Sequence, residues 1–345
     1  MVCACVLAQG CADSHQPLPI AEAPLFAGVG VDGSAATSDD GIVWRRAHIR
    51  ASGEFVSLAA GSNVLVALTR EGEIAASGDG RSWRVDTLPP AEEWTDVEYS
   101  GGRFLAVGFT WADGVIASFS DDGLSWRTVA GPPVRPSVLL PVGDTFYLHS
   151  WHLGDLPDTY GHIVRNDTFE SVDPVDVSHA IRRADETFAL GRAVVSTRDG
   201  QRWVQQGEPL PERYFALAFG NDRYVAAGFG NRVASSSNLR EWVVSESLAM
   251  EDALFRDLAF GAGVFVAAGT EVMWSEDGAV WNRADGADGI REVVYVEFST
   301  EARPAGGESC GPSDEICGDT YCDRCEGGVL IRCATIETGA GLPPC

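Results

Sequence analysis

The sequence predicts an all-β fold, a seven-bladed β-propeller whose blades each hold four antiparallel strands. Three observations predict it. A short turn motif recurs along the chain, and its closing tryptophans are 39, 43, 77, 39 and 39 residues apart. Short apolar runs lie between the copies with turn residues separating them. No long stretch shows helical periodicity. A period near forty residues with four strand-like segments per repeat is typical of propeller blades.

The turn motif has the pattern Ser-x-Asp-Gly-x-x-Trp and joins two apolar runs, which predicts a hairpin. Its hydroxyl and carboxylate oxygens can accept hydrogen bonds from N–H groups of the turn. Glycine supplies a positive φ, and the tryptophan has a large apolar face to bury. One copy has Thr for Ser, and another has Asn for Asp and lacks the glycine. The motif positions are Ser38, Asp40, Gly41, Trp44, Ser77, Asp79, Gly80, Trp83, Ser120, Asp122, Gly123, Trp126, Thr197, Asp199, Gly200, Trp203, Ser236, Asn238, Trp242, Ser275, Asp277, Gly278 and Trp281.

This motif resembles the Asp-box, or BNR, repeat of sialidases, sortilins, photosystem assembly factors and many exported bacterial propellers. The copies are one residue shorter than the commonest form of that family. The resemblance implies that each box joins the third and fourth strands of a blade on the outer rim, away from the active face, and has a structural role. Sialidases also carry an Arg-Ile-Pro motif, which is absent from this chain. We therefore expect a sialidase-like fold without sialidase activity.

Each repeat has further strands before its box. A pattern of the form Gly-x-x-aromatic-aliphatic-Ala-x-Gly occurs at 101–108 and again, with variations, at 221–228 and 261–269. An additional strand precedes it, as in 95–99 and 256–260. These segments complete the four strands of a blade.

The 77-residue gap between two boxes is about two periods long, so it should contain a degenerate blade. Segments 137–140, 145–148 and 162–165 have the composition of strands, and 166–169 stands where the box would be, with Phe169 in place of tryptophan. This unit brings the predicted number of blades to seven, with six and eight as the alternatives.

The two ends of the repeat region predict how the ring closes. The first repeat begins at its second strand, 25–30, and an extra strand follows the last box at 291–298. We expect this extra strand to be the inner strand of the first blade, because a ring closed in this way has no free edge. The predicted propeller spans residues 24–300.

The charge of the chain excludes several classes of partner. Asp and Glu number 50 against 25 basic residues, all of them Arg, for a net charge of −25. This favours neither nucleic acid nor an anionic membrane surface as a partner. The absence of lysine excludes Schiff-base chemistry and a P-loop lysine. We expect no cofactor and no resident metal.

The N-terminal residues 1–11 resemble the end of a bacterial lipoprotein signal, which implies that Cys11 is processed and lipidated. A conventional export signal or a merely apolar terminus are the alternatives. Residues 12–23 are a polar, proline-containing tether. The expected location is therefore outside the cytoplasm of a bacterium, in the periplasm or on the outer membrane or cell surface, and the lipid is the only membrane contact expected.

The C-terminal segment, 301–345, is rich in cysteine. Six cysteines in a short Gly- and Pro-containing segment favour three disulfides, in any of 15 pairings. A zinc half-site at Cys322 and Cys325 is the alternative, although no second such pair completes it. The six are Cys310, Cys317, Cys322, Cys325, Cys333 and Cys345.

The candidate binding residues lie in the degenerate blade and in the blade before it. Residues 149–162 form the longest predicted loop of the repeats, and 110–114 form a smaller one. Loops inserted into a repeat often form the binding face. Aromatic faces beside Asp acceptors suit sugars or peptides, while a well-packed capping loop or a metal site are the alternatives. The residues are Trp111, Asp113, His149, Trp151, His152, Asp155, Asp158, Tyr160 and His162.

The sequence thus predicts an exported, lipid-anchored, monomeric propeller that binds a protein or glycan and catalyses no reaction. The first alternative is a glycan-active hydrolase or lyase that uses acidic residues of the propeller face. The second is a structural surface protein attached through its disulfide-rich segment.

Overall fold

The computed structural model describes residues 18–21, 23–61, 63–152, 158–228, 232–245 and 254–298, and three strands of the C-terminal segment. Contacts divide the chain into two compact units, Met1–Phe298 and Ser299–Cys345. In the second unit, β29 (Glu315–Cys317), β30 (Tyr321–Glu326) and β31 (Val329–Ala334) form one antiparallel sheet. Cys11, Asp155, Cys310 and Cys345 lie outside the described residues, as do the side chains of the four cysteines in these strands.

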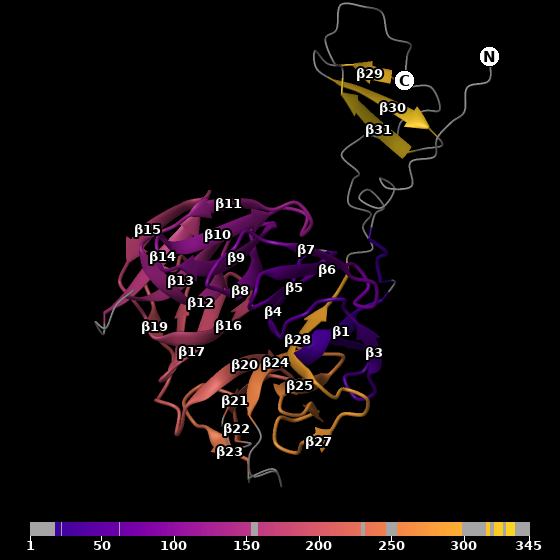
Figure 1. The fold of residues 1–345 in the computed structure, drawn as a ribbon. Coiled ribbons are helices and arrows are strands. Elements are labelled where there is room, and N and C mark those ends of the chain that lie inside the picture. The colour runs from indigo at the N-terminus through magenta and orange to yellow at the C-terminus, as the bar shows by residue number, and fades with distance from the viewer. Residues whose placement is uncertain are drawn as a thin grey trace, which may run out of the picture. The chain divides into compact units, whose positions relative to one another are not determined.

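The first unit is a propeller of seven four-stranded antiparallel sheets (Figure 1). Each sheet is one blade, and its strands follow one another from the inside of the ring outward. The strands are β28 (Ile290–Val296), β1 (Leu25–Gly30), β2 (Ser34–Ser38) and β3 (Arg45–His48) in blade 1; β4 (Phe55–Ala60), β5 (Leu65–Thr69), β6 (Glu73–Ser77) and β7 (Arg84–Thr87) in blade 2; β8 (Glu93–Ser100), β9 (Arg103–Thr110), β10 (Gly114–Ser120) and β11 (Arg127–Ala130) in blade 3; β12 (Val134–Val142), β13 (Thr145–His152), β14 (Thr159–Arg165) and β15 (Thr168–Val172) in blade 4; β16 (Val177–Arg183), β17 (Glu186–Gly191), β18 (Val194–Thr197) and β19 (Val204–Gln205) in blade 5; β20 (Tyr214–Gly220), β21 (Arg223–Gly228), β22 (Val233–Ser236) and β23 (Val243–Val244) in blade 6; and β24 (Phe255–Gly261), β25 (Val264–Gly269), β26 (Met273–Ser275) and β27 (Asn282–Arg283) in blade 7.

Blade 1 closes the ring by strand exchange, as predicted. Its inner strand, β28, pairs antiparallel with β1, so that Leu25 lies opposite Val296 and Val29 opposite Glu292. The inner strands of neighbouring blades contact one another around the whole ring, with β28 meeting both β24 and β4. The predicted count of seven blades is confirmed.

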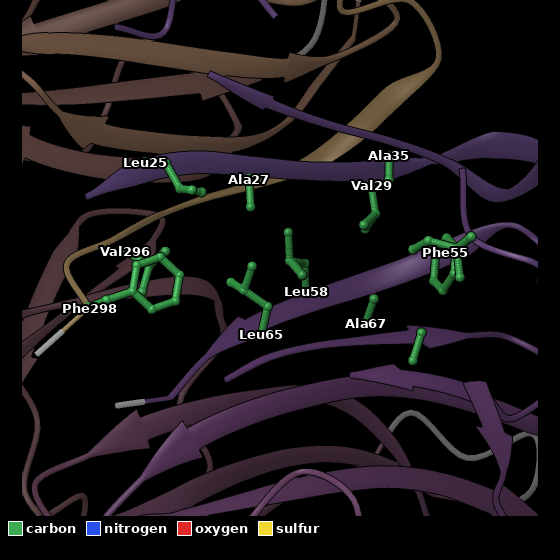
Figure 2. Packing of buried hydrophobic residues seen from close by; sticks show 12 residues of the cluster. Leu25, Ala27, Val29, Ala35, Phe55, Leu58, Leu65, Ala67, Val296 and Phe298 are labelled. Atoms are coloured by element: carbon green, nitrogen blue, oxygen red, sulfur yellow. The ribbon is translucent and has the colours of Figure 1, made fainter. Parts of the chain in front are cut away.

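The hydrophobic core is divided among the gaps between blades. The buried apolar residues form seven clusters, and each one joins two neighbouring blades. Figure 2 shows the cluster between blades 1 and 2, where Leu25 and Val296 of blade 1 face Leu58 and Leu65 of blade 2. Because both the first and the last strand of the ring contribute to this cluster, apolar burial adds to the closure made by hydrogen bonds.

The boxes form the hydrogen-bonded turns that the sequence predicts. In blade 1, the Gly41 N–H donates to Ser38 Oγ at 2.8 Å, and the Ile42 and Val43 N–H groups donate to Asp40 Oδ1 at 2.8 and 3.0 Å. Gly41 has φ = 76°. The same bonds recur in the other five boxes.

The box of blade 6 lacks glycine, and it also lacks one hydrogen bond that the other boxes form. Leu239 stands at the glycine position with φ = 63°, a strained backbone for a residue with a side chain. In the other five boxes the tryptophan Nε1 donates to the glycine carbonyl at 3.0 to 3.2 Å. The Nε1 of Trp242 is buried and has no hydrogen-bond partner within the described part of the chain.

Blade 4, the degenerate blade, has a tight turn in place of a box. Asn166 and Asp167 both have positive φ and connect β14 to β15, where Phe169 lies. The predicted long loop 149–162 is wrong in its extent, because β13 continues to His152 and β14 begins at Thr159. Cross-strand pairing of Trp151 with Thr159 accounts for the extra strand length.

Candidate functional site

The two ends of the ring carry different features. The box end is the end where the six boxes lie: Phe26 pairs with Ser38 there, and the chain enters and leaves the ring there through Leu25 and Val296. The mouth is the opposite end, where Thr110 pairs with Gly114 and β13 ends at His152. The described candidate residues of both predicted loops therefore belong to the mouth or to the strands that lead to it.

Trp111 and Asp113 lie in the turn between β9 and β10. The Trp111 side chain is 60% exposed and packs edge-to-face on Phe109, with ring centroids 5.3 Å apart. The Asp113 N–H donates to Thr110 Oγ1 at 3.0 Å, which fixes the turn. An indole held by one edge contact, with its other surface in solvent, is available to a ligand.

Trp151 and His152 occupy the end of β13. Trp151 is 46% exposed and lies opposite Arg135 of β12 in the strand register. The ring of His152 is 6.4 Å from that of Tyr160 in β14, and the His152 N–H donates to the Asp158 carbonyl at 3.0 Å. Strand pairing rather than a loop thus positions Trp151 at the mouth.

His149 and His162 lie inside blade 4, below the mouth. Their exposed fractions are 2% and 5%, and burial lowers the pKa of both imidazoles. Among the residues that the structure describes, neither ring nitrogen of His149 has a hydrogen-bond partner. The imidazole of His149 packs edge-to-face against Trp151, with ring centroids 5.6 Å apart, and that of His162 lies against Phe169. The structure therefore places these two candidates beneath the mouth, where His149 supports the exposed indole of Trp151.

A cavity of about 690 Å³ opens at the mouth, and Trp151 and His152 line it. We call it the mouth cavity. Its charged lining consists of Arg70 from the turn after β5, Glu93 and Arg135 at the starts of β8 and β12, and Arg256 of β24. Its apolar lining consists of Val56, Trp94, Pro136 and Trp151.

Glu93 joins two of the arginines in the mouth cavity. Arg135 Nη2 donates to Glu93 Oε2 at 2.9 Å, and Arg70 Nη1 pairs with Glu93 Oε1. The Arg135 guanidinium also lies over the ring of Phe109, 4.7 Å from its centroid, a favourable cation–π position. Phe109 in turn supports Trp111, so the exposed indole and the ion pair belong to one packed unit.

A second cavity, of about 700 Å³, forms the channel along the axis of the ring. Four carboxylates from the inner strands line it: Asp96, Glu98, Asp257 and Glu292. Burial raises the pKa of Asp96 to about 6. Burial, together with the charges of Asp96 and Asp257, raises the pKa of Glu98 and of Glu292 well above the ordinary range of a glutamate.

Two channel carboxylates connect neighbouring blades. Asp96 Oδ2 accepts a hydrogen bond from the Leu139 N–H at 3.1 Å, and Asp257 Oδ2 accepts one from the Val293 N–H at 2.8 Å. Each bond joins the inner strand of one blade to that of the next. His179 bridges in a similar way, with Nδ1 accepting from the Leu217 N–H at 3.3 Å and Nε2 3.3 Å from Asp257 Oδ1.

Among the described residues, no three His, Cys, Asp or Glu side chains are arranged to hold a metal ion. Within that same part of the chain, no helix is long and apolar enough to cross a bilayer.

Sequence reasoning missed the cationic mouth cavity and the acidic channel. The feature that marks the channel is a charged or polar residue in the inner strand directly after a β-bulge, as at Ser57, Asp96, His179 and Asp257. The mouth cavity has no such signal, because Glu93 is 23 residues from Arg70 and 42 from Arg135.

Comparison with known proteins shows the fold. No protein-family model matches the sequence, and no curated protein matches it at a significant level. YCF48 bound to a D1 peptide is similar in structure, with a TM-score of 0.52 and 14% identity over 77% of this chain and 95% of that chain. The WD40 propeller domain of Doa1 has a TM-score of 0.54 and 12% identity, covering 75% and 91%. A putative 6-phosphogluconolactonase from Bacteroides fragilis has a TM-score of 0.56 and 8% identity, covering 80% and 99%.

Proposed function

We propose that this protein is a non-catalytic binding propeller that holds a peptide segment of a protein partner at its mouth. The observation that carries the proposal is the pairing of a cavity of about 690 Å³ with two indoles at the same end of the ring, Trp111 and Trp151, that are 60% and 46% exposed. Exposed tryptophans beside a cavity with charged groups are typical of recognition surfaces.

A structural neighbour supports a peptide as the ligand. YCF48, which has the same fold, was solved bound to a D1 peptide. A similar fold does not by itself imply the same ligand. The support for a peptide must therefore come from the residues and the volume of the mouth cavity. A cavity of this volume accommodates a few residues of an extended chain and leaves the rest of the partner outside the ring.

The acidic residues of the ring favour a structural role over the glycan-active alternative. A glycosidase would need a carboxyl pair beside the bound sugar. Glu93, the carboxylate of the mouth cavity, is paired with two arginines. Asp96 and Asp257 lie deeper, in the channel, and bind backbone N–H groups of the next blade. Binding is therefore the function that the geometry supports best.

Substitution of the exposed indoles tests the proposal. Trp151→Ala and Trp111→Ala should each weaken binding of octapeptides on an array by about tenfold, because a buried aromatic contact contributes about 1–2 kcal/mol or more. The matched control is Val280→Ala, which changes an exposed side chain (66% exposed) at the box end. Unchanged binding by both tryptophan variants would contradict the proposed site, and no binding by the unaltered protein would contradict a peptide ligand.

We also propose that the protein is exported and carries a lipid on Cys11. Residues 12–17 separate Cys11 from Leu18, and this stretch spans about 25 Å at most when extended. The Ala21 N–H donates to the Gly78 carbonyl at 2.8 Å, which attaches the N-terminal segment to the box of blade 2. A lipid on Cys11 would therefore hold the box end near the membrane and leave the mouth facing away from it.

Intact-mass analysis of the protein purified from its native membrane fraction tests this anchor. The expected mass is that of the chain beginning at Cys11 with its acyl groups attached and three disulfides formed. A mass that corresponds to an unmodified chain containing Cys11 would contradict the lipid anchor.

A further inference from the structure

The mouth cavity carries an excess of positive charge in a strongly acidic protein. Arg70, Arg135 and Arg256 line it, against one carboxylate, that of Glu93, while the whole chain has a net charge of −25. A concave cluster of guanidinium groups concentrates positive potential and attracts anionic groups. The acidic remainder of the surface would repel the same groups, so the charge of the ring directs an anion to the mouth.

The donors of this cluster are only partly used. Glu93 pairs with one guanidinium nitrogen each of Arg70 and Arg135, and each guanidinium has five N–H donors. Arg256, from blade 7, lines both the mouth cavity and the channel below it, where its charge acts on Glu292 without a direct ion pair between the two described side chains. Arg70 and Arg135 are about half exposed, at 51% and 45%, so they are accessible from solvent.

The balance of donors and acceptors indicates which chemical group fits. The acceptor carboxylate, Glu93, is 18% exposed and already paired, and the Thr95 hydroxyl donates to the Val107 carbonyl at 3.1 Å. A sugar ring brings many hydroxyl donors that require acceptors, and the carboxylate in the lining of this cavity is already engaged by two guanidinium groups. A carboxylate accepts only, and it matches the planar fork of arginine. The apolar lining at Val56, Pro136 and Trp151 suits the aliphatic and aromatic parts of a peptide.

We propose that the mouth cavity binds a carboxylate of a peptide ligand through Arg135, Arg70 and Arg256, and that Glu93 occupies the same donors when the ligand is absent. This inference rests on the peptide-binding function proposed above. Glu93 is then an internal competitor: the ligand carboxylate takes over donors that Glu93 holds. The carboxylate belongs either to an Asp or Glu side chain or to the C-terminus of the peptide.

An octapeptide array probed with the full-length protein at fixed pH and low salt distinguishes these sources. One set of peptides has a single Glu and an amidated C-terminus, a second has no acidic residue and a free C-terminus, and a third has neither carboxylate. We expect the first or the second set to bind at least about tenfold more tightly than the third, because hydrogen bonds between charged groups contribute about 1.5–3 kcal/mol each.

Charge variants test the internal competitor. Glu93→Gln should tighten binding of the preferred set by about tenfold, because it removes the negative charge that competes for the guanidinium donors. Arg135→Gln and Arg256→Gln should weaken it by about the same factor. Arg240→Gln, at an exposed position in the box of blade 6, is the matched control and should change nothing. A gain of affinity in Glu93→Gln cannot result from misfolding.

Four results of these binding experiments would each overturn a different part of the proposal. Equal binding of all three peptide sets, unaffected by the arginine variants, would overturn the carboxylate inference and leave peptide binding at the mouth intact. Failure of every peptide set to bind the unaltered protein would overturn the proposed function itself. Tighter binding of trigalacturonate, an acidic sugar, than of any peptide would overturn the choice of a peptide. Weakened peptide binding in Glu93→Gln would overturn the role of Glu93 as a competitor.

Discussion

At the scale of single residues, the channel buries carboxyl groups, and burial disfavours their ionised form. Glu98 and Glu292 line the channel, and burial together with the nearby Asp96 and Asp257 raises their pKa values. The channel lining also contains His179, Arg182, Arg183 and Arg256. Of these, His179 lowers the pKa of Asp96 and Arg256 that of Glu292, but burial outweighs both effects. These carboxyl groups therefore cost stability at neutral pH.

This cost predicts a pH dependence with a definite sign. A carboxyl group whose pKa is raised in the folded state favours folding below its unfolded pKa, and this contribution is lost as the pH rises through the folded pKa. For Asp96 that window runs from the ordinary value of 3.8 to about 6. We expect the free energy of unfolding, measured by urea titration, to fall as the pH rises from about 5 to 8.

Replacing a channel glutamate by glutamine should remove part of the pH dependence of the free energy of unfolding. Glu98→Gln and Glu292→Gln should each raise the free energy of unfolding at pH 8 by about 1–3 kcal/mol and change it less at pH 5. Glu241→Gln, an exposed position in the box of blade 6, is the control and should be neutral at both pH values. Destabilisation of both channel variants at pH 8 would contradict this account.

At the scale of elements, the boxes fasten each blade to the one before it. A Cβ on Gly123 of blade 3 would lie 2.9 Å from Val64 Cγ1 and from Val66 Cγ2 of blade 2, and a Cβ on Gly80 of blade 2 would lie 2.6 Å from Thr37 of blade 1. The box glycines thus have two requirements, a positive φ and a close approach to a neighbouring blade.

Substitutions at two glycines, Gly123 and Gly102, test these two requirements separately. Gly123 and Gly102 have similar backbones, with φ of 73° and 83°, but a Cβ on Gly102 would meet nothing within 4 Å. Gly102→Ala should cost about 1 kcal/mol from backbone strain alone. Gly123→Ala should cost about 2–4 kcal/mol, because overpacking adds about 1–3 kcal/mol. Equal losses in thermal or urea unfolding would show that the box glycine serves its own turn only.

The strands and turns were predicted from the sequence far better than the site was. The residues that define a turn are close together in the sequence, whereas those that form the site are far apart. A box is defined by Ser38, Asp40, Gly41 and Trp44, which contact one another within seven residues, so a local pattern suffices to recognise it. Ring closure was predictable because one strand was missing at the start and one was left over at the end. Trp111 and Trp151 were found as aromatic residues near predicted loops.

The mouth cavity depends on residues that only the closed ring brings together. Arg70, Glu93 and Arg256 come from blades 2, 3 and 7, and no spacing along the chain relates them. His149 and His162 were misplaced for a related reason. A run of polar and aromatic residues was interpreted as a loop, whereas pairing with β14 extends β13 to His152 and buries both imidazoles.

At the scale of the whole molecule, the proposed anchor and the proposed binding site lie at opposite ends of the ring. The N-terminal segment, the first strand of the ring and the exit at Val296 all lie at the box end. The exposed tryptophans and the mouth cavity lie at the other end. The channel between the two ends is lined by four carboxylates, two of which, Asp96 and Asp257, connect neighbouring inner strands. We therefore expect the ligand to bind at the mouth.

Hydrogen–deuterium exchange of the full-length protein, with and without a carboxylate-bearing octapeptide selected on the array, tests that claim most directly. Bound peptide should slow the exchange of backbone amides at the starts of β8 and β12 and at the end of β13, around Glu93, Arg135 and Trp151. Amides of the six box turns should exchange as in the free protein. Slowed exchange at the box turns without a change at the mouth would contradict the account.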